Sequence, residues 1–298
     1  MEQNVIIQTF VNGVMLSTVL ILFALGLSLI FGIMHIVNFA HGEVYMLGGF
    51  GMWWFFAEER LIGGQGLPGF VLSLVLTMVL VAFIGVVMER LFFRKFRGNL
   101  LPGLIISVGL IFVMQASVAK GWGFLDKAIP TPSAFEGVIH AAGATLSKER
   151  LFVIVIAVVC VVGLYLFLMR TRQGRSMRAC SQDPDAAALQ GIGVDRTCSI
   201  AMAIGCALAA ASGCLAGSVF LVNPYMGSFP LLKAFVAIIL GGMGSLPGTI
   251  LGGFVIGFTE SFGSTYLSST VASMLIFLVL IAVLVVRPMG FFGRPLGH

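Results

Sequence analysis

Charged side chains are scarce in this sequence. Only 10% of the 298 residues are Asp, Glu, Lys or Arg, whereas 59% are hydrophobic. Soluble domains carry about a quarter charged and about half apolar residues, so the composition excludes an ordinary water-soluble protein. The net charge of +5 does not indicate nucleic-acid binding, because the basic residues lie in short segments beside apolar runs. In that position they orient a membrane protein.

Signals for metal, nucleotide and catalytic sites are also missing. The five cysteines form no CxxC pair and four of them lie within apolar runs, so neither zinc nor an iron–sulfur cluster is expected. No lysine is followed by Ser or Thr, which excludes the phosphate-binding loop G-x-x-x-x-G-K-[ST]. Ser245, in GMGSLPG, does not fit the nucleophile elbow. We therefore expect no enzyme activity and no cofactor in this chain, and any ATP that drives it must bind another subunit.

Long apolar runs make up most of the chain. A membrane-spanning helix needs about 20 mostly apolar residues, and clear runs cover residues 5–31, 69–88, 100–119, 151–169, 198–222 and 270–286. With two interrupted runs, they predict an all-α integral membrane protein, a polytopic bundle of about eight membrane segments in a single domain over residues 1–298. The beginning of the chain has no basic n-region or cleavage site, so we do not interpret it as a signal peptide.

Two segments interrupt the apolar pattern, 32–49 (GIMHIVNFAHGEVYMLGG) and 241–248 (GGMGSLPG). The first mixes polar side chains with glycines, and the second is too rich in glycine and proline for a regular helix. Both predict broken or re-entrant helices. Irregular backbone at membrane depth is stable only when it is buried in protein or lines a wet cavity, and paired broken helices often mark a binding site. The candidate pathway residues are Asn38, His41, Glu43, Gly241, Gly242, Gly244 and Ser245.

Glu43 is the candidate carboxylate of this pathway, because ionisable groups within a membrane segment are usually functional. The alternative is that Glu43 and His41 lie at the headgroup interface and pair locally. His35 is expected to be a packing residue.

Small residues recur every fourth position in the run 198–222, at Gly205, Ala209, Gly213 and Gly217. This spacing places them on one helix face and predicts close packing against a neighbouring helix.

The basic residues predict the orientation of the chain. Segments 89–99, 170–197 and 287–298 hold four, five and two Lys or Arg, eleven of the seventeen. Short basic loops remain on the cytoplasmic side. An outer N-terminus places all three there, provided that residues 231–262 enter and leave on the same face.

The segment 170–197 is both basic and strongly polar, and lies between two apolar runs. Asp183 can cap a helix that begins at Pro184, with Asp185 near its positive end. The sequence AAAL favours a helix that Gly191 would end. The segment is either a solvated loop with a short helix or a docking element for a soluble partner.

Several long motifs, in order along the chain, resemble the permease subunits of bacterial branched-chain amino acid ABC importers, the LivH type. The motifs are IVNFAHGEVYMLGG (36–49), MERLFFRKFR (88–97), RACSQDPDAAALQGIGVDR (178–196), NPYMGSFPLLKAFVAIILGGMGSLPGTILGG (223–253) and RPMGFFGRP (287–295). The resemblance covers nearly the whole chain. It implies a multi-pass subunit of the bacterial inner membrane that forms the translocation pathway.

The resemblance also implies the partners: a second, LivM-like permease subunit, two ABC ATPase subunits that bind ATP and Mg²⁺, and a periplasmic substrate-binding protein. It implies a cytoplasmic coupling segment at about 170–197 that contacts the ATPase through residues 178–193. The candidate coupling residues are Arg178, Asp183, Pro184, Asp185, Ala188, Gly191 and Ile192.

Three other functions remain open at this point. Relatives in the family import urea, short amides or other amino acids, so the substrate is not fixed. A secondary transporter or channel would also need broken helices, but it would work without an ATPase. A structural or assembly subunit would have no pathway of its own.

Overall fold

The computed structural model describes residues 2–59, 66–97, 100–132, 135–141, 144–287 and 290–292. Nearly all of its regular elements are helices, and six of these are long and apolar enough to cross a membrane. The predicted all-α, multi-pass membrane protein is therefore confirmed. The predicted number of about eight membrane segments is not confirmed. Helices α2, α9 and α10 are not among the six helices that are long and apolar enough to span a membrane. The longer helices are α1 (Glu2–Met34), α3 (Leu67–Met88), α4 (Leu100–Trp122), α5 (Lys148–Arg170), α8 (Val194–Val219), α10 (Leu246–Tyr266) and α11 (Ser269–Val286).

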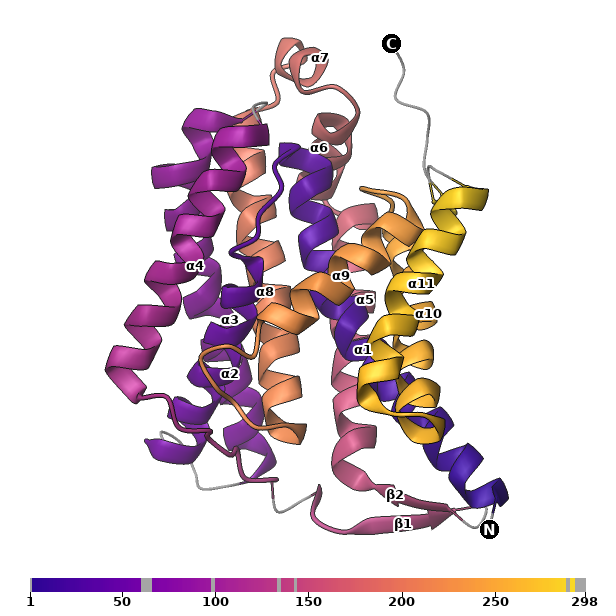
Figure 1. Cartoon of the computed structure of the whole chain (residues 1–298). Helices are drawn as coiled ribbons and strands as arrows, with labels where there is room; N and C mark the ends of the chain where they lie inside the picture. The colour runs from indigo at the N-terminus through magenta and orange to yellow at the C-terminus, as the bar shows by residue number, and fades with distance from the viewer. Residues whose placement is uncertain are drawn as a thin grey trace.

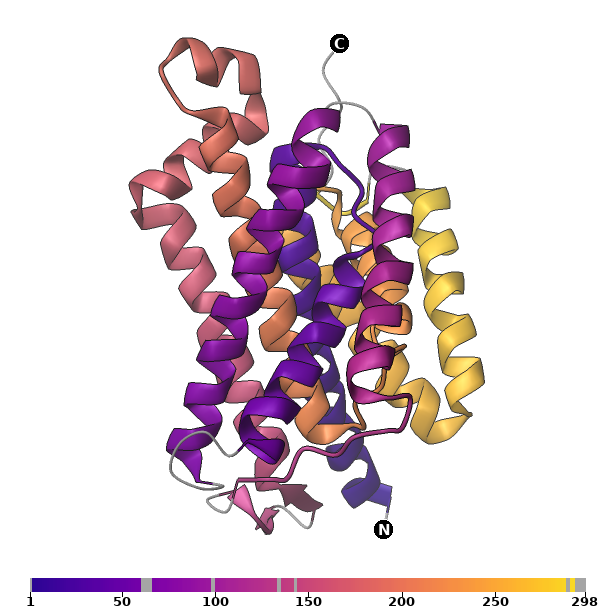
Figure 2. The same ribbon diagram turned by 90° about the vertical axis from the view of Figure 1, so that its left-hand side faces the viewer.

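Helices α1 and α8 form the centre of the bundle. In each, 78% of the most apolar window is buried, compared with 22% in α4 and 11% in α11. Helix α1 packs on α8 and α10, and α8 packs on α2 (His41–Met52) and α3. Helices α4, α5 and α11 lie outside this centre and expose apolar faces (Figures 1 and 2).

The small-residue face of α8 packs as its spacing predicts. A Cβ atom added at Gly26 of α1 would lie 2.5 Å from the carbonyl oxygen of Gly205. Further along α8, Gly213 packs against the backbone of Tyr45 in α2, and the backbone of Ala210 packs against Gly48. Any larger side chain at these crossings would separate the helix backbones, so α1, α2 and α8 depend on these small residues for their contact.

The first predicted break is shorter than expected. Helix α1 ends at Met34, residues 35–40 are not helical, and α2 begins at His41 and continues in a π-helical turn, Trp53–Glu58. The backbone leaves α1 through His35, whose φ is 52°. Gly42, Gly48 and Gly49 were expected to interrupt the chain, but they lie inside α2. Their missing side chains allow close contact instead, of Gly42 and Gly48 with neighbouring backbone and of Gly49 with the side chains of Met226 and Val222.

The second predicted break forms a hairpin of helices. The short α9 (Ser228–Gly241) ends in a turn where Gly242 and Gly244 have φ of 95° and 80°. The next helix, α10, begins with Ser245 as its cap, whose hydroxyl accepts a hydrogen bond of 3.2 Å from the Gly248 N–H. The chain approaches α9 from the end of the bundle at which α10 finishes (Figure 1). Residues 231–262 therefore enter and leave on the same face, as the orientation requires.

The described basic segments share one end of the bundle. Helices α6 (Arg172–Gln182) and α7 (Pro184–Leu189) lie there with the end of α11 and the short turns Glu89–Phe93 and Arg94–Phe96 (Figures 1 and 2). The N-terminus lies at the opposite end, beside an antiparallel hairpin of β1 (Val138–Ala141) and β2 (Ala144–Ser147). We call the end with the basic segments the inner end, following the preference of such segments for the cytoplasmic side.

Candidate functional site

Two short helices begin next to each other within the bundle. A Cβ atom added at Gly42, in the first turn of α2, would lie 2.8 Å from the carbonyl oxygen of Gly227, the residue before α9. The first turn of a helix has N–H groups without partners in the helix, and it carries partial positive charge. The two starts therefore concentrate polar backbone groups inside a chain that is otherwise apolar.

Three of the predicted pathway residues gather at the start of α2, and all three are buried: Asn38, His41 and Glu43 are 1%, 0% and 2% exposed. Among the described residues, both polar atoms of the Asn38 side chain and the Oε2 atom of Glu43 have no hydrogen-bond partner. Buried polar groups normally have partners, so these atoms are suited to bind water or a polar solute. Glu43 and His41 are thus buried by protein, and among the described residues Glu43 pairs with Gln115 and not with His41.

The ring of His41 packs against an aromatic side chain of α1. It stacks on Phe23 of α1 with ring centroids 5.0 Å apart and an angle of 14° between the planes. Its Nε2 atom lies at the crossing of α1 and α8, 3.2 Å from where a Cβ atom of Gly26 would be. The ring face of His41 is thus held by Phe23, but both of its nitrogen atoms, like the polar atoms of Asn38 and Oε2 of Glu43, have no hydrogen-bond partner among the described residues.

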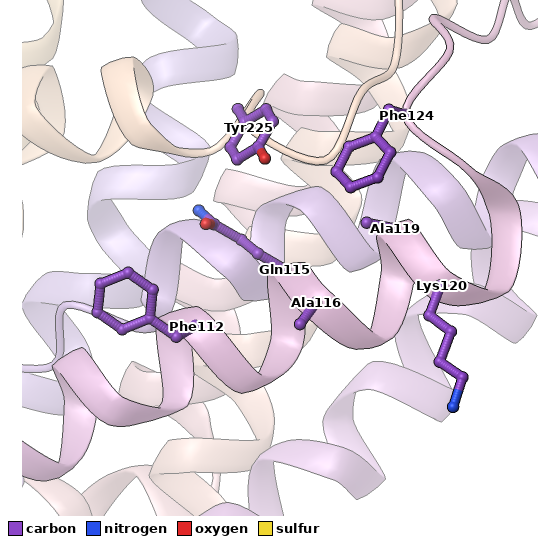
Figure 3. Close-up of a pocket in the computed structure, with 7 residues that line it drawn as sticks. All are labelled: Phe112, Gln115, Ala116, Ala119, Lys120, Phe124 and Tyr225. Atoms are coloured by element: carbon purple, nitrogen blue, oxygen red, sulfur yellow. The ribbon is translucent and has the colours of Figure 1, made fainter.

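Glu43 connects the start of α2 to a hollow on α4. Its Oε1 atom accepts a hydrogen bond of 2.9 Å from Nε2 of Gln115. Gln115 lines a hollow of about 380 Å³ together with Phe112, Ala116, Ala119, Lys120, Phe124 and Tyr225. Figure 3 shows its amide directed toward Tyr225, while Lys120 points away. Gln115 was not among the predicted pathway residues, although its polar amide within an apolar run was an available signal.

The glycine residues of the second break lie at another place. Gly241 packs against Gly248, and Gly244 lies beside Gly32 near the end of α1. The backbone N–H groups of Phe291 and Phe292 donate hydrogen bonds of 2.8 and 3.0 Å to the carbonyl oxygens of Leu240 and Gly241. The described contacts thus join the turn to α1 and to the C-terminal segment, and they do not join Gly241, Gly242, Gly244 or Ser245 to Asn38 or Glu43.

The predicted cap of the coupling segment is present. One carboxylate oxygen of Asp183 accepts hydrogen bonds of 2.9 Å from the N–H groups of Asp185 and Ala186, and Pro184 is the first residue of α7. Gly191 follows with a φ of 80°. Within α7 only Ala187 is buried, whereas Leu189 is 88% exposed.

The segment before α7, for which no helix was predicted, forms helix α6. Thr171 caps it by accepting a hydrogen bond of 3.0 Å from the Gly174 N–H. Gly174 packs against the backbone of Leu168 at the end of α5, and Arg178 reaches back to the sulfur of Met169. Of the other predicted coupling residues, Asp185, Ala188 and Gly191 are exposed, and Ile192 is half-buried.

A buried carboxylate at the inner end was missed by the sequence analysis. Glu89 is fully buried, and its Oε2 atom accepts hydrogen bonds from Ser199 at 2.6 Å and from Arg94 at 3.3 Å. Arg97 forms ion pairs with both Glu89 and Asp195. This network, which we call the Glu89 network, joins the end of α3 to the first turns of α8, directly after α7. The signal was a single acidic residue in a basic segment.

Comparisons with known proteins identify relatives over nearly the whole chain. Residues 9–284 match the family described as the permease component of branched-chain amino acid transport systems. The chain is 35% identical to the high-affinity branched-chain amino acid transport system permease proteins BraD of Pseudomonas aeruginosa and LivH of Escherichia coli K12. Each alignment covers 97% of this chain and 96% of the relative. Among solved structures, PsaBC from Streptococcus pneumoniae in complex with Fab superposes with a TM-score of 0.48 at 13% identity, covering 95% of this chain and 91% of that one.

Proposed function

The chain belongs to the family of permease components of branched-chain amino acid transport systems, and on that basis we propose that it is the membrane permease subunit of an ATP-driven bacterial importer of branched-chain amino acids. It acts in the inner membrane with a second permease subunit, two ABC ATPase subunits and a periplasmic binding protein. ATP and Mg²⁺ bind to the ATPase subunits and supply the energy. This chain provides the coupling surface and part of the pathway.

The single observation that best supports the proposal is helix α7. It is capped by Asp183, it is almost entirely exposed, and it lies at the end of the bundle that holds the basic segments. A soluble partner can therefore contact Asp185, Ala188 and Leu189 without disturbing the membrane-embedded core.

Movement of α7 would reach the core through its neighbours. On one side α6 packs against α5, α1 and α8. On the other side a connection of four residues joins α7 to α8, and the Glu89 network holds the first turns of α8 to the end of α3. The small residues of α8 bring its backbone close to the backbone of α1 and α2, and we propose that the helices slide along these contacts.

The proposed substrate pathway passes the start of α2. Asn38 and Glu43 offer buried polar atoms without partners, and the first turns of α2 and α9 add partial positive charge. As α7 moves, the start of α2 becomes accessible alternately from the outer and from the inner side of the membrane.

The test is uptake by the complete complex reconstituted in vesicles. We expect radiolabelled leucine to enter only with ATP inside and the binding protein outside, and unlabelled valine and isoleucine to compete with it. Uptake without ATP would indicate a secondary transporter or channel. Competition by urea or short amides, but not by valine, would move the protein to another substrate class of the same family.

A further inference from the structure

A second cavity, of about 260 Å³, lies between α1, α2, α8, α9 and α10. Most of its lining is apolar, with Met15 and Leu20 from α1, Leu215 from α8 and Met226 before α9. Pockets for small molecules begin at roughly 300 Å³, so its size suits a solute with only a few heavy atoms. Phe229 and Leu221 lie at its edge and are exposed.

The cavity contains one ion pair. Lys233 Nζ of α9 lies 2.5 Å from Glu260 Oε1 of α10, and these side chains are only 20% and 26% exposed. Elsewhere in the described part of the chain, the ion pairs belong to the Glu89 network at the inner end. Glu260 lies roughly 9 Å before the outer end of α10, given a rise of about 1.5 Å per residue. Charged groups inside membrane segments are costly and usually functional.

The cavity also adjoins the start of α2. Phe23 and Tyr45 line it, with their ring centroids 5.1 Å apart, and Phe23 stacks on His41. A solute held beside Lys233 and Glu260 would thus be separated by one aromatic ring from the residues of the proposed pathway.

From this geometry we infer that the cavity is an outer binding site for a zwitterionic aliphatic amino acid. The substrate carboxylate binds the ammonium group of Lys233, the substrate ammonium binds the carboxylate of Glu260, and the aliphatic side chain lies against Met15, Leu20 and Leu215. The inference rests on the proposed function and adds to it the place and manner in which the charged ends of the substrate are recognised.

The charges explain why a zwitterion fits. Lys233 and Glu260 neutralise each other in the empty cavity, and a zwitterion inserted between them gives each a new partner without adding net charge. An amine or a carboxylate of the same shape would bring one uncompensated charge into an apolar surrounding, which is unfavourable. Urea brings no charge and leaves the apolar walls without contact.

The test separates this role from a purely structural one, in which the pair only joins α9 to α10. In the complete importer, Lys233→Met and Glu260→Gln should each raise the KM for leucine uptake by about ten- to hundredfold, as the loss of a hydrogen bond to a charged group implies. The double variant Lys233→Glu/Glu260→Lys keeps an ion pair between α9 and α10 but exchanges the positions of its positive and negative charges. We expect it to assemble with a raised KM, and leucine uptake with the wild-type KM would overturn the inference.

A second measurement does not depend on the folding of those variants. Leu16 lines the cavity and is half-buried, whereas Leu251 is exposed on α10 and does not line it. In the assembled complex without ATP or binding protein, leucine should slow the thiol labelling of Leu16→Cys but not of Leu251→Cys. The native cysteines give a low background, since Cys180, Cys198, Cys206 and Cys214 are buried and Cys160 is half-buried. Equal labelling with and without leucine would refute the site.

Analogues with one charge test the assignment of each end. The amine 3-methylbutylamine should protect Leu16→Cys poorly in the wild-type chain but better once Lys233→Met is added, because Glu260 then lacks a counter-charge. The carboxylate 4-methylpentanoate should behave in the same way with Glu260→Gln. Unchanged protection would contradict the assignment. A complex that imports urea instead of leucine would contradict the proposed function, whereas the labelling assay reports on the cavity alone.

Discussion

The hydroxyl group of Ser199 donates a hydrogen bond of 2.6 Å to Glu89, a carboxylate that is completely buried. The two residues are 110 positions apart, and their contact joins the inner end of α3 to the beginning of α8. Two arginines, Arg94 and Arg97, complete the charge balance. Glu89 and Asp195 thus hold the end of α3 to the first turns of α8, the helix that follows α7.

Replacing Glu89 with alanine should weaken both stability and coupling. Two arginine side chains would lose their shared partner, and breaking a buried ion pair costs about 3–5 kcal/mol. We expect a lower thermal midpoint of the purified complex and ATP hydrolysis that no longer depends on substrate delivery. Glu59→Ala is a matched control, because Glu59 is exposed and follows the π-helical turn at the end of α2. Wild-type behaviour of Glu89→Ala in both assays would refute this role.

The cap of α7 can be tested through Asp183. Asp183→Ala removes the acceptor of two hydrogen bonds and should destabilise the helix by about 0.5–2 kcal/mol. Asp183→Ser restores a capping oxygen and should retain most activity. The double variant Asp183→Lys/Asp185→Lys also reverses the charge at the positive helix end and should hydrolyse ATP without uptake. Normal uptake by the double variant would show that α7 does not couple the two processes.

The pathway assignment predicts a loss of transport without a loss of assembly. Glu43→Gln preserves the shape of the side chain and an oxygen that can accept the bond from Gln115, but it removes the charge. Glu43→Gln and Asn38→Ala should each reduce leucine uptake at least about tenfold, as expected when polar groups contact the solute. Assembly is followed by copurification with the partner subunits. Full uptake by both variants would exclude these side chains from the pathway.

The helix crossing of α2 and α8 should tolerate no added side-chain atoms. A Cβ atom at Gly213 would overlap the carbonyl group of Tyr45, so Gly213→Val should lower stability by more than the roughly 1–3 kcal/mol typical of overpacking. Gly163→Ala in α5 is the control, because no atom lies within 4 Å of an added Cβ there. It should be neutral or slightly stabilising, since alanine favours helices over glycine. Thermal midpoints of the two complexes measure the difference.

Much of the fold follows from local sequence. The apolar runs predict the long helices, the Asp183-Pro184 pair predicts the start of α7, and the basic segments predict the common inner end. These features depend on residues close together in the chain. The positions of both breaks were also predicted, since helix propensity falls locally in each segment.

What sequence could not predict depends on distant partners. The glycines of α2 were expected to break the helix, but Ala210 of α8 and Met226 lie so close to Gly48 and Gly49 that packing preserves it. The contact of Gln115 with Glu43 and the pairing of Lys233 with Glu260 join residues on different helices. No spacing rule connects such positions, because their separation is set by how the helices pack.

The attachment of the C-terminal segment to α9 has a consequence for biosynthesis. The backbone of Phe291 and Phe292 satisfies the last carbonyl groups of α9, and Gly290 fits closely there with a φ of 73°. These residues leave the ribosome about fifty positions after the helix that they secure. The inner end of α9 therefore reaches its final bonding only after α11 has been made, so closure of this hairpin waits for the helix that follows it.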